Sequence, residues 1–292
     1  MRLTYLFTLL MFFSFQNLKA QDDLLSVLDS MDDKTKTDYI TGTFKGVRLI
    51  NGYTSETPGK KELIFTISHR FLRVTSGIES LYGLDGATIR FSFDYGINER
   101  LSLGVGRSNR EDLVDGYVKY KIARQATGAK NFPVTITWLE GIAVRTQEWS
   151  NKNINYPGSA RLNYIHELFI SRKFNDNLSL QLSPVVIHRN MVEENDDQNT
   201  VPALGFGGRY RITQRFCFNA EYYYLFPGET ADEYQNSLSL GFALQVGGHI
   251  FQAHFSNSIG MTEKHFIPET RGNWLGDDIY FGFNIIRLFS LR

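Results

Sequence analysis

The residues of this sequence that come closest to a catalytic pair are His254 and Ser256, an imidazole and a hydroxyl two positions apart. Alternate residues of an extended chain share one face, so we expect these two side chains to lie together. A serine nucleophile also needs a base within hydrogen-bond reach and a third group that orients the base. No Asn or Asp is evident on that face. We therefore expect that the chain is not an enzyme and has no catalytic residue.

Histidines are also common metal ligands. His69, His188, His249 and His254 lie in or beside segments in which apolar and polar residues alternate, and of these four His254 alone falls on the polar parity. The single cysteine, Cys217, excludes an internal disulfide and a cysteine-based metal cage. The glycine-rich stretches lie inside or between the alternating segments, which is not the setting of a phosphate loop. The sequence predicts neither a metal site nor a bound cofactor.

The elements that must position these residues are β-strands. In residues 216–224, Phe, Ala and Tyr occupy one parity, and Cys, Asn, Glu and Tyr occupy the other. In residues 238–246, Leu, Phe and Val alternate with Ser, Gly, Ala and Gln. A period of two places the two sets on opposite faces of a strand. Long strands in successive hairpins with an uninterrupted apolar face are typical of a transmembrane barrel.

Twelve such segments follow one another along the chain: 62–71, 87–96, 101–108, 114–125, 133–146, 161–174, 178–190, 203–212, 216–224, 237–246, 250–258 and 278–289. The connections between them are alternately short and long, as in bacterial barrels with short periplasmic turns and longer extracellular loops. The sequence therefore predicts an all-β fold, a transmembrane antiparallel up-and-down β-barrel of about 12 strands. A further β-like segment, 39–56, leaves a barrel of about 14 strands open as the alternative.

The N-terminal residues are typical of an exported protein. A basic start, an apolar run and Ala20 indicate that residues 1–20 are a signal peptide that is cleaved after Ala20. We expect residues 21–60 to form a short periplasmic helix, from Leu24 to Met31, followed by a segment that plugs or caps the barrel. Residues 61–292 are then the barrel, and the predicted location is the outer membrane.

Charge and composition agree with this interpretation. The 31 Lys and Arg residues balance the 31 Asp and Glu residues. This balance argues against a nucleic-acid partner, because phosphate contacts need a basic excess. The mean hydropathy of −0.25 is low for a helical membrane protein. It fits a barrel, because only alternate strand residues face lipid.

Charged side chains on the polar parity are expected to line the lumen, since a charge that faces lipid at the bilayer midplane costs ~2–4 kcal/mol. The predicted lumen-lining residues are Arg70, Arg90, Asp94, Lys119, Lys121, Arg161, Glu167, Arg189, Arg209, Arg211, Glu221 and His254. Most of these charges are cationic, which would favour anions in a narrow pore. The alternative is a set of ion pairs and hydrogen bonds that fills the barrel.

One acidic residue does not follow the pattern. Glu140 falls on the lipid-facing parity of its segment. The glycine that follows, Gly141, predicts a β-bulge that swaps the two faces.

Several stretches carry a resemblance to a known family. They are TFKGVRLING, ELIFTISHRF, GLDGATIRFSFDYGI, GFGGRYRIT, VGGHIFQAHFSNS and DIYFGFNIIRLF. Together they resemble a family of outer-membrane β-barrel proteins of Bacteroidetes-type Gram-negative bacteria, whose function is unknown. The resemblance covers nearly all of the chain after residue 20, and it implies the fold and the location. It supplies no substrate and no catalytic residue.

A second resemblance concerns His254 and Ser256 alone, which are similar to the His-x-Ser of twelve-stranded outer-membrane phospholipases. That chemistry needs the lipid-facing surface, whereas the parity of these residues points them into the lumen. A lipid hydrolase is therefore a minor alternative.

The faces of the strands leave two main functional interpretations. The barrel is either a narrow pore for small polar or anionic solutes or a largely filled structural barrel. A further alternative is a scaffold that docks a periplasmic protein partner at the N-terminal segment. Outer-membrane lipid is the partner that all of these share.

Overall fold

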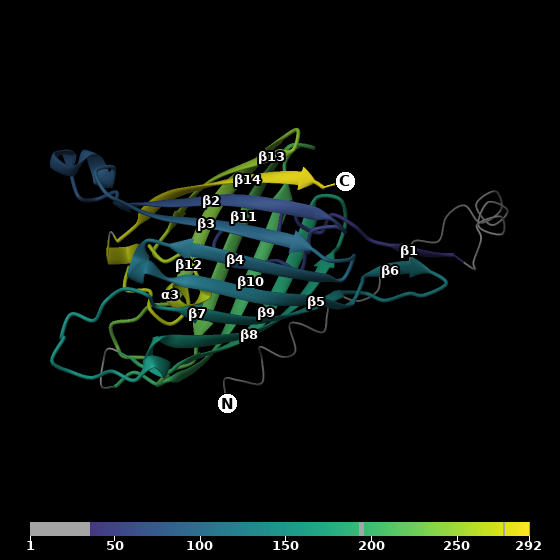
Figure 1. Ribbon diagram of the computed structural model, residues 1–292. Helices are drawn as coiled ribbons and strands as arrows, with labels where there is room; N and C mark the ends of the chain where they lie inside the picture. The colour runs from purple at the N-terminus through teal and green to yellow at the C-terminus, as the bar shows by residue number, and fades with distance from the viewer. Residues whose placement is uncertain (1–35, 193–195, 277, 292) are drawn as a thin grey trace, which may run out of the picture.

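The fold is a closed barrel of antiparallel strands (Figure 1). The computed structural model describes residues 36–192, 196–276 and 278–291. The twelve barrel strands are β2 (Glu62–Arg73), β3 (Ala87–Gly96), β4 (Leu101–Ser108), β5 (Val114–Ala123), β7 (Thr135–Val144), β8 (Leu162–Lys173), β9 (Leu178–Arg189), β10 (Thr200–Arg211), β11 (Phe216–Leu225), β12 (Ser237–Val246), β13 (His249–Ser256) and β14 (Tyr280–Ser290). Each strand pairs with the next, and β14 pairs with β2 to close the ring. The predicted twelve-stranded up-and-down barrel is confirmed.

Two further strands lie outside the ring. β1 (Thr37–Tyr39) pairs with β6 (Ala126–Gly128), which belongs to the connection between β5 and β7. These strands pair with each other rather than with the barrel, so the alternative of 14 barrel strands is wrong. The predicted signal peptide and the predicted short helix fall within residues 1–35, which lie outside the described residues.

The two ends of the barrel differ in the length of most of their connections. We call the end with the short connections the turn end, and β1, β6 and the last residues of β14 lie there (Figure 1). The other end, the loop end, carries the short helices η1 (Ile78–Gly83), η2 (Arg110–Asp112), η3 (Gly158–Arg161), α3 (Glu263–Phe266) and η4 (Trp274–Gly276). No helix in the described part of the chain is long and apolar enough to span a membrane.

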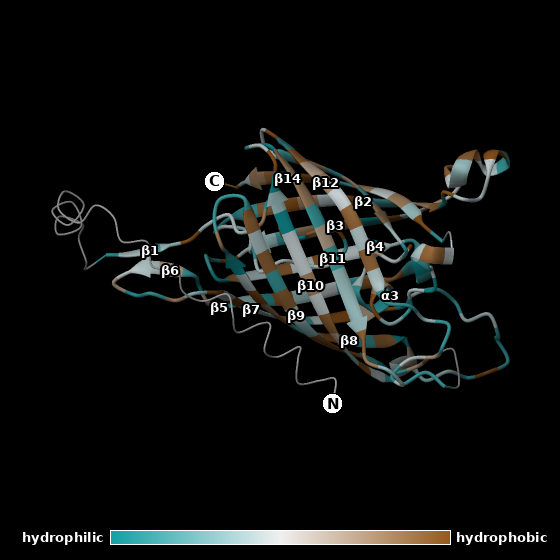
Figure 2. Cartoon of the chain, turned by 180° about the vertical axis from the view of Figure 1, so that it is seen from behind, coloured by the Kyte–Doolittle hydropathy of each residue, from teal (hydrophilic) through white to brown (hydrophobic). Residues whose placement is uncertain are grey.

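The two faces of the barrel follow the alternation of the sequence. In β3, Arg90 and Asp94 are buried on the inner face, whereas Phe91 and Phe93 are 48% and 46% exposed on the outer face. Outer aromatic side chains also contact their neighbours across strands, as Phe65 and Phe93 do with ring centroids 4.9 Å apart. Figure 2 shows the same alternation along the strands as bands of hydrophobic and hydrophilic residues. The outer face is therefore an apolar band that suits lipid.

The bulge predicted at Gly141 is wrong. The pairing of β7 runs without a break through Tyr117 and Gly141 on one side and through Gly141 and Ile165 on the other. The irregularity of the β5–β7 ladder lies instead between Lys121 and Ala123. Because the register is continuous, Glu140 stays on the outer face.

The inside of the barrel is occupied by a segment that precedes β2. Residues 43–55, which we call the lumen segment, form a hairpin in which the Leu49 N–H donates to the Gly52 carbonyl over 2.9 Å. Most of these residues are buried. The carboxylate of Glu221 on β11 accepts the backbone N–H groups of Ile50, Asn51 and Gly52 over 3.1, 2.8 and 3.1 Å. One side chain thus accepts all three N–H groups at the tip of the hairpin.

A second segment enters from the loop end. Residues 257–272, the loop-end segment, include α3, and Phe266 and Ile267 are fully buried in the main apolar cluster. The ring of Phe266 meets the edge of Tyr223 with centroids 5.1 Å apart. The two segments meet where the Arg48 guanidinium lies 3.4 Å from a Glu263 carboxylate oxygen. The lumen is therefore filled from both ends.

Glu221 offers a test of how the lumen segment is held. In the variant Glu221→Ala, three buried N–H donors lose their acceptor, and we expect the free energy of unfolding to fall by about 2–4 kcal/mol. Urea unfolding of the barrel in lipid vesicles, followed by tryptophan fluorescence, measures this loss. Glu79→Ala is the control, because Glu79 is exposed in the loop between β2 and β3. Equal stability of the two variants would contradict the assigned role.

Candidate functional site

Nine of the predicted lumen-lining residues are buried on the inner face. They are Arg70, Arg90, Asp94, Lys119, Glu167, Arg189, Arg209, Glu221 and His254, each at most 4% exposed. The parity of the strands positions them there, since each occupies an inward position of its strand.

Hydrogen bonds join most of these residues to neighbours. Both Arg90 Nε and an Arg90 terminal nitrogen donate to the Asp115 carboxylate. The Tyr117 hydroxyl donates to the Asp94 carboxylate over 2.5 Å. Arg70 donates to the Asn51 side-chain oxygen of the lumen segment over 2.6 Å. These groups therefore help to fill the barrel and to hold its contents.

The other three predicted residues lie at the ends of the barrel. At the turn end, Lys121 is 3.7 Å from Glu56, and Arg211 is 3.6 Å from Asp176. At the loop end, Arg161 lies in η3, where it donates to the Gln147 carbonyl over 2.8 Å. Parity gives the face on which a residue lies but not its position along the strand. These three residues lie near the ends of the barrel, where the strands begin or end.

Acidic residues balance the buried cations. The buried charged side chains include seven Lys or Arg residues and six Asp or Glu residues: Arg48, Arg70, Arg90, Lys119, Arg189, Arg209 and Lys264, with Asp94, Asp115, Glu167, Asp197, Glu221 and Glu263. Asp197 and Glu263 come from loops, so strand parity could not reveal them. Asp115 shares the parity of Lys119 and could have been found in that way.

His254 and Ser256 do not form a nucleophile and base pair. The Ser239 hydroxyl donates to the Ser256 oxygen over 2.9 Å. Both ring nitrogens of His254 lack a hydrogen-bond partner among the described residues. Both side chains are buried on the inner face, away from the lipid-facing surface. The geometry gives no support to a lipid hydrolase, whose serine would need an oriented base.

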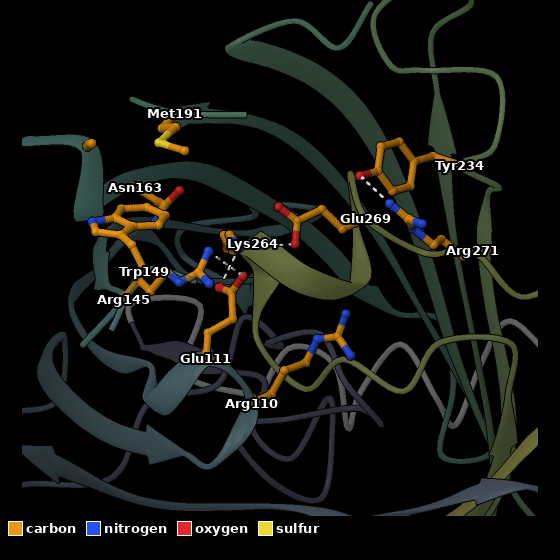
Figure 3. Close-up of a pocket in the computed structure, with 11 residues that line it drawn as sticks. Arg110, Glu111, Arg145, Trp149, Asn163, Met191, Tyr234, Lys264, Glu269 and Arg271 are labelled. Carbon is orange, nitrogen blue, oxygen red and sulfur yellow. Dashed lines mark hydrogen bonds and ion pairs between the residues drawn. The ribbon is translucent and has the colours of Figure 1, made fainter. Parts of the chain in front are cut away.

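A pocket of about 320 Å³ opens at the loop end above the filled lumen. Its lining combines cations, acids and aromatic rings: Arg110, Glu111, Arg145, Trp149, Ala160, Asn163, Met191, Tyr234, Lys264, Glu269 and Arg271 (Figure 3). Lys264 comes from α3 and Asn163 from an inward position of β8, so the floor of the pocket is the top of the lumen. We call this the loop-end pocket.

The acids of the loop-end pocket are held by cations. The Lys264 ammonium lies 2.6 Å from a Glu111 oxygen and 3.1 Å from a Glu269 oxygen. The Glu111 carboxylate also lies 3.0 Å from His265 Nε2 and 3.6 Å from Arg145. Burial raises the pKa of Glu111, but the His265 hydrogen bond and the Lys264 charge outweigh it and hold that pKa below its usual range. Burial, followed by the Lys264 charge, lowers the pKa of His265.

Glu111, His265 and Glu269 could supply metal ligands, since one ligand atom of each lies within 4.8 Å of the others. The Lys264 ammonium, however, already bonds to both carboxylates. The arrangement therefore serves as an ion-pair cluster that fixes the loop-end segment. Sequence reasoning missed this group, because Glu111 and His265 are 154 positions apart and lie in loops.

Aromatic rings and guanidinium groups form the wall of the loop-end pocket. The guanidinium groups of Arg145 and Arg161 lie over the Trp149 ring, 4.5 and 5.3 Å from its centroid. Arg271 lies 5.3 Å from the centroid of Tyr234. Guanidinium groups can bind a carboxylate or phosphate through two parallel hydrogen bonds. The apolar faces of the Trp149 and Tyr234 rings can pack against a ring of a solute. These groups suit a small anionic or polar solute.

Comparison with known families identifies the class of protein. Residues 44–289 match the family described as "Membrane bound beta barrel domain (DUF5777)". The chain belongs to this family, and the predicted membership of a membrane β-barrel family is confirmed. A search of curated protein sequences finds no match.

Solved structures include barrels of similar architecture. The NanC porin has a TM-score of 0.48 at 10% identity, covering 79% of this chain and 100% of that one. The KdgM porin has a TM-score of 0.45 at 10% identity, with 79% and 99% covered. An outer membrane channel from Pseudomonas putida F1 has a TM-score of 0.45 at 10% identity, with 80% and 97% covered. Similarity at this level says nothing about the solute.

The ion-pair cluster predicts a pH dependence at the loop end. The folded pKa of His265 lies below its usual value, so between the two values the unfolded state binds more protons and stability falls as the pH falls. The stabilisation from Glu111 is present above the usual carboxyl pKa and is lost as the pH falls through the lower folded pKa. Acidification from about pH 7 to pH 4 should therefore loosen the loop-end segment.

Hydrogen exchange of the amides of residues 260–270 measures this loosening, after correction for the intrinsic pH effect on exchange. The variant His265→Gln removes the imidazole. The loss of protection that comes from His265 should therefore disappear, whereas the loss at lower pH that comes from Glu111 should remain. Protection that does not change with pH in the unsubstituted protein would refute the assignment.

Proposed function

We propose that this protein is an outer-membrane channel for small anionic solutes that is closed at rest by the lumen segment and the loop-end segment. The observation that carries the proposal is the loop-end pocket, which places four cationic and two acidic side chains above the top of the lumen. The apolar outer band and the sequence of residues 1–20 support the location.

The lining of the pocket supports an anionic solute. Four cations outnumber two carboxylates there, and Lys264 and Arg145 form ion pairs with these acids, so the lining keeps a net positive charge. Arg110 keeps a buried Nε that has no hydrogen-bond partner among the described residues. A cleft lined by one sign of charge concentrates ions of the opposite sign. The interior of the barrel is nearly balanced in charge, so we place the selectivity at the loop end.

The way in which the lumen is filled supports release of the lumen segment. Both of its ends lie at the turn end, where Lys45 donates to Gln245 over 2.8 Å and Lys119 donates to the Glu56 carbonyl over 2.6 Å. Many of its contacts with the wall are hydrogen bonds, which water can replace. The hairpin can therefore leave toward the turn end without opening the barrel.

Single-channel conductance in planar bilayers tests the proposal. We expect the full-length protein to be silent or nearly silent. A variant that lacks residues 21–56 and has residues 260–270 replaced by a short Gly-Ser linker should give discrete conductance steps, because both segments are then absent. Circular dichroism and heat-dependent gel mobility serve as controls for a folded barrel.

Silence of the folded double variant would contradict the channel. That result would instead favour a second role, the docking of a periplasmic protein. One observation supports this role: the two-stranded sheet of β1 and β6 stands outside the barrel at the turn end and exposes Tyr39.

The ionic preference of the opened channel tests the loop-end pocket separately. Arg110→Gln combined with Arg271→Gln removes two positive charges, and we expect the chloride-to-potassium permeability ratio to fall by ~3-fold or more. Reversal potentials in a salt gradient measure this ratio. Arg107→Gln combined with Arg172→Gln is the matched control, because both side chains are exposed on the outer face and the pair removes the same two charges. An equal effect of the control would show that the pocket does not set selectivity.

A further inference from the structure

The outer face of β7 and β8 carries a polar pair within the apolar band. Glu140 is the sixth residue of β7, and His166 is the fifth residue of β8. They pair directly across the two strands, with Glu140 Oε1 2.5 Å from His166 Nδ1. Their side chains are 38% and 49% exposed. The neighbours on this face, Trp138 and Ile142, are apolar and exposed.

This position is unfavourable in a lone barrel. Among the twelve barrel strands that the structure describes, Glu140 is the one carboxylate on the outward parity. The others, Glu62, Asp94, Asp115, Glu167 and Glu221, all have inward parity. Lipid chains offer no hydrogen-bond partner for the remaining oxygen and nitrogen atoms of the pair. A polar partner at the same height would remove this penalty.

The pair is complementary to itself. Glu140 and His166 are opposite each other in the ladder. Neighbouring strands lie ~5 Å apart and barrel strands are tilted by about 35–45°, so the two residues differ in height along the membrane normal by only ~3 Å. A two-fold axis along the membrane normal, between the two columns of side chains, preserves height and exchanges left and right. Glu140 of one copy then faces His166 of the second copy, and this contact occurs twice.

We propose that the outer wall around β7 and β8 is an interface with a second copy of this chain, related by such a two-fold axis. The self-complementary pair favours a second copy over an unrelated protein, because the same patch supplies both halves of the contact. A contact between an imidazole and a carboxylate of this kind fixes the register of two surfaces.

The shape of the wall supports the same assignment. An outward groove of about 310 Å³ lies over β7 to β10 beside the pair, with Trp138, His166 and Pro202 in its lining. A second outward groove of about 580 Å³ continues the surface to β11, over Gly208 and Ala220. Both are mainly apolar. Side chains of a second copy could fill these grooves, as in the packed core of a subunit interface.

The test changes the charge at one of the two positions of the pair at a time. Glu140→Lys gives a patch with two cationic or neutral groups, and His166→Glu gives a patch with two carboxylates, so neither is complementary to itself. We expect each variant alone to self-associate at least tenfold more weakly than the unsubstituted protein. An equimolar mixture of the two should recover association. Energy transfer between differently labelled copies in vesicles measures all three cases.

Two further variants keep the proposal testable if Glu140→Lys or His166→Glu does not fold. The double variant Glu140→Leu, His166→Leu removes the polar pair, and it should fold and yet associate more weakly. Leu168→Cys places a thiol beside the proposed axis, and a short bis-maleimide should link two copies. Phe251→Cys, on the outer face of β13, is the control and should give no link.

Any of three results would overturn the proposal. One is a monomer at every protein-to-lipid ratio, which would mean that lipid alone covers the pair. A second is association that the substitutions at positions 140 and 166 leave unchanged. A third is a cross-link at position 251 in place of position 168.

Discussion

The structure depends on closing the hydrogen-bond ladder between β14 and β2. Within lipid, every backbone N–H and C=O must be paired inside the protein, so a sheet in a membrane can have no free edge. Closure with up-and-down connections also requires an even number of strands when both termini lie at one end. With twelve strands, the ring is wider than the eight-stranded barrels whose wall side chains alone fill the interior. The remaining space is what the lumen segment and the loop-end segment occupy.

Filling that space with backbone creates a second requirement, because a buried hairpin brings its own N–H and C=O groups. Side chains on the inner face of the barrel provide hydrogen-bond partners for these backbone groups. Glu221 accepts three N–H groups at the hairpin tip, while Asn219 and Gln252 both donate to the Leu49 carbonyl, over 3.1 and 2.9 Å. A Cβ at Gly52 would collide with Tyr223, so the tip lies as close to the wall as a chain can. Many polar side chains on the inner face thus serve to bind the lumen segment of the same protein.

Alternation and loop length were sufficient to predict the barrel, its strand number and the face of most strand residues. They failed where position along a strand or contacts between loops decide the outcome. Arg161 and Arg211 have inward parity but lie at the ends of the barrel. The ion-pair cluster at the loop end brings Glu111 to His265 across 154 positions, and no local pattern encodes such a contact. The bulge at Gly141 was wrong because it assumed that a carboxylate cannot stay on the outer face.

The lumen segment begins and ends at the same end of the barrel, and this has a mechanical consequence. A pull on the N-terminal strand would load the β1–β6 pairing first, the Lys45 contacts next and the Glu221 cradle last. Bonds that break one after another yield to a far smaller force than bonds that must break together. A pull on the N-terminal end would therefore draw the lumen segment out contact by contact, while the strand pairing of the barrel wall stays intact.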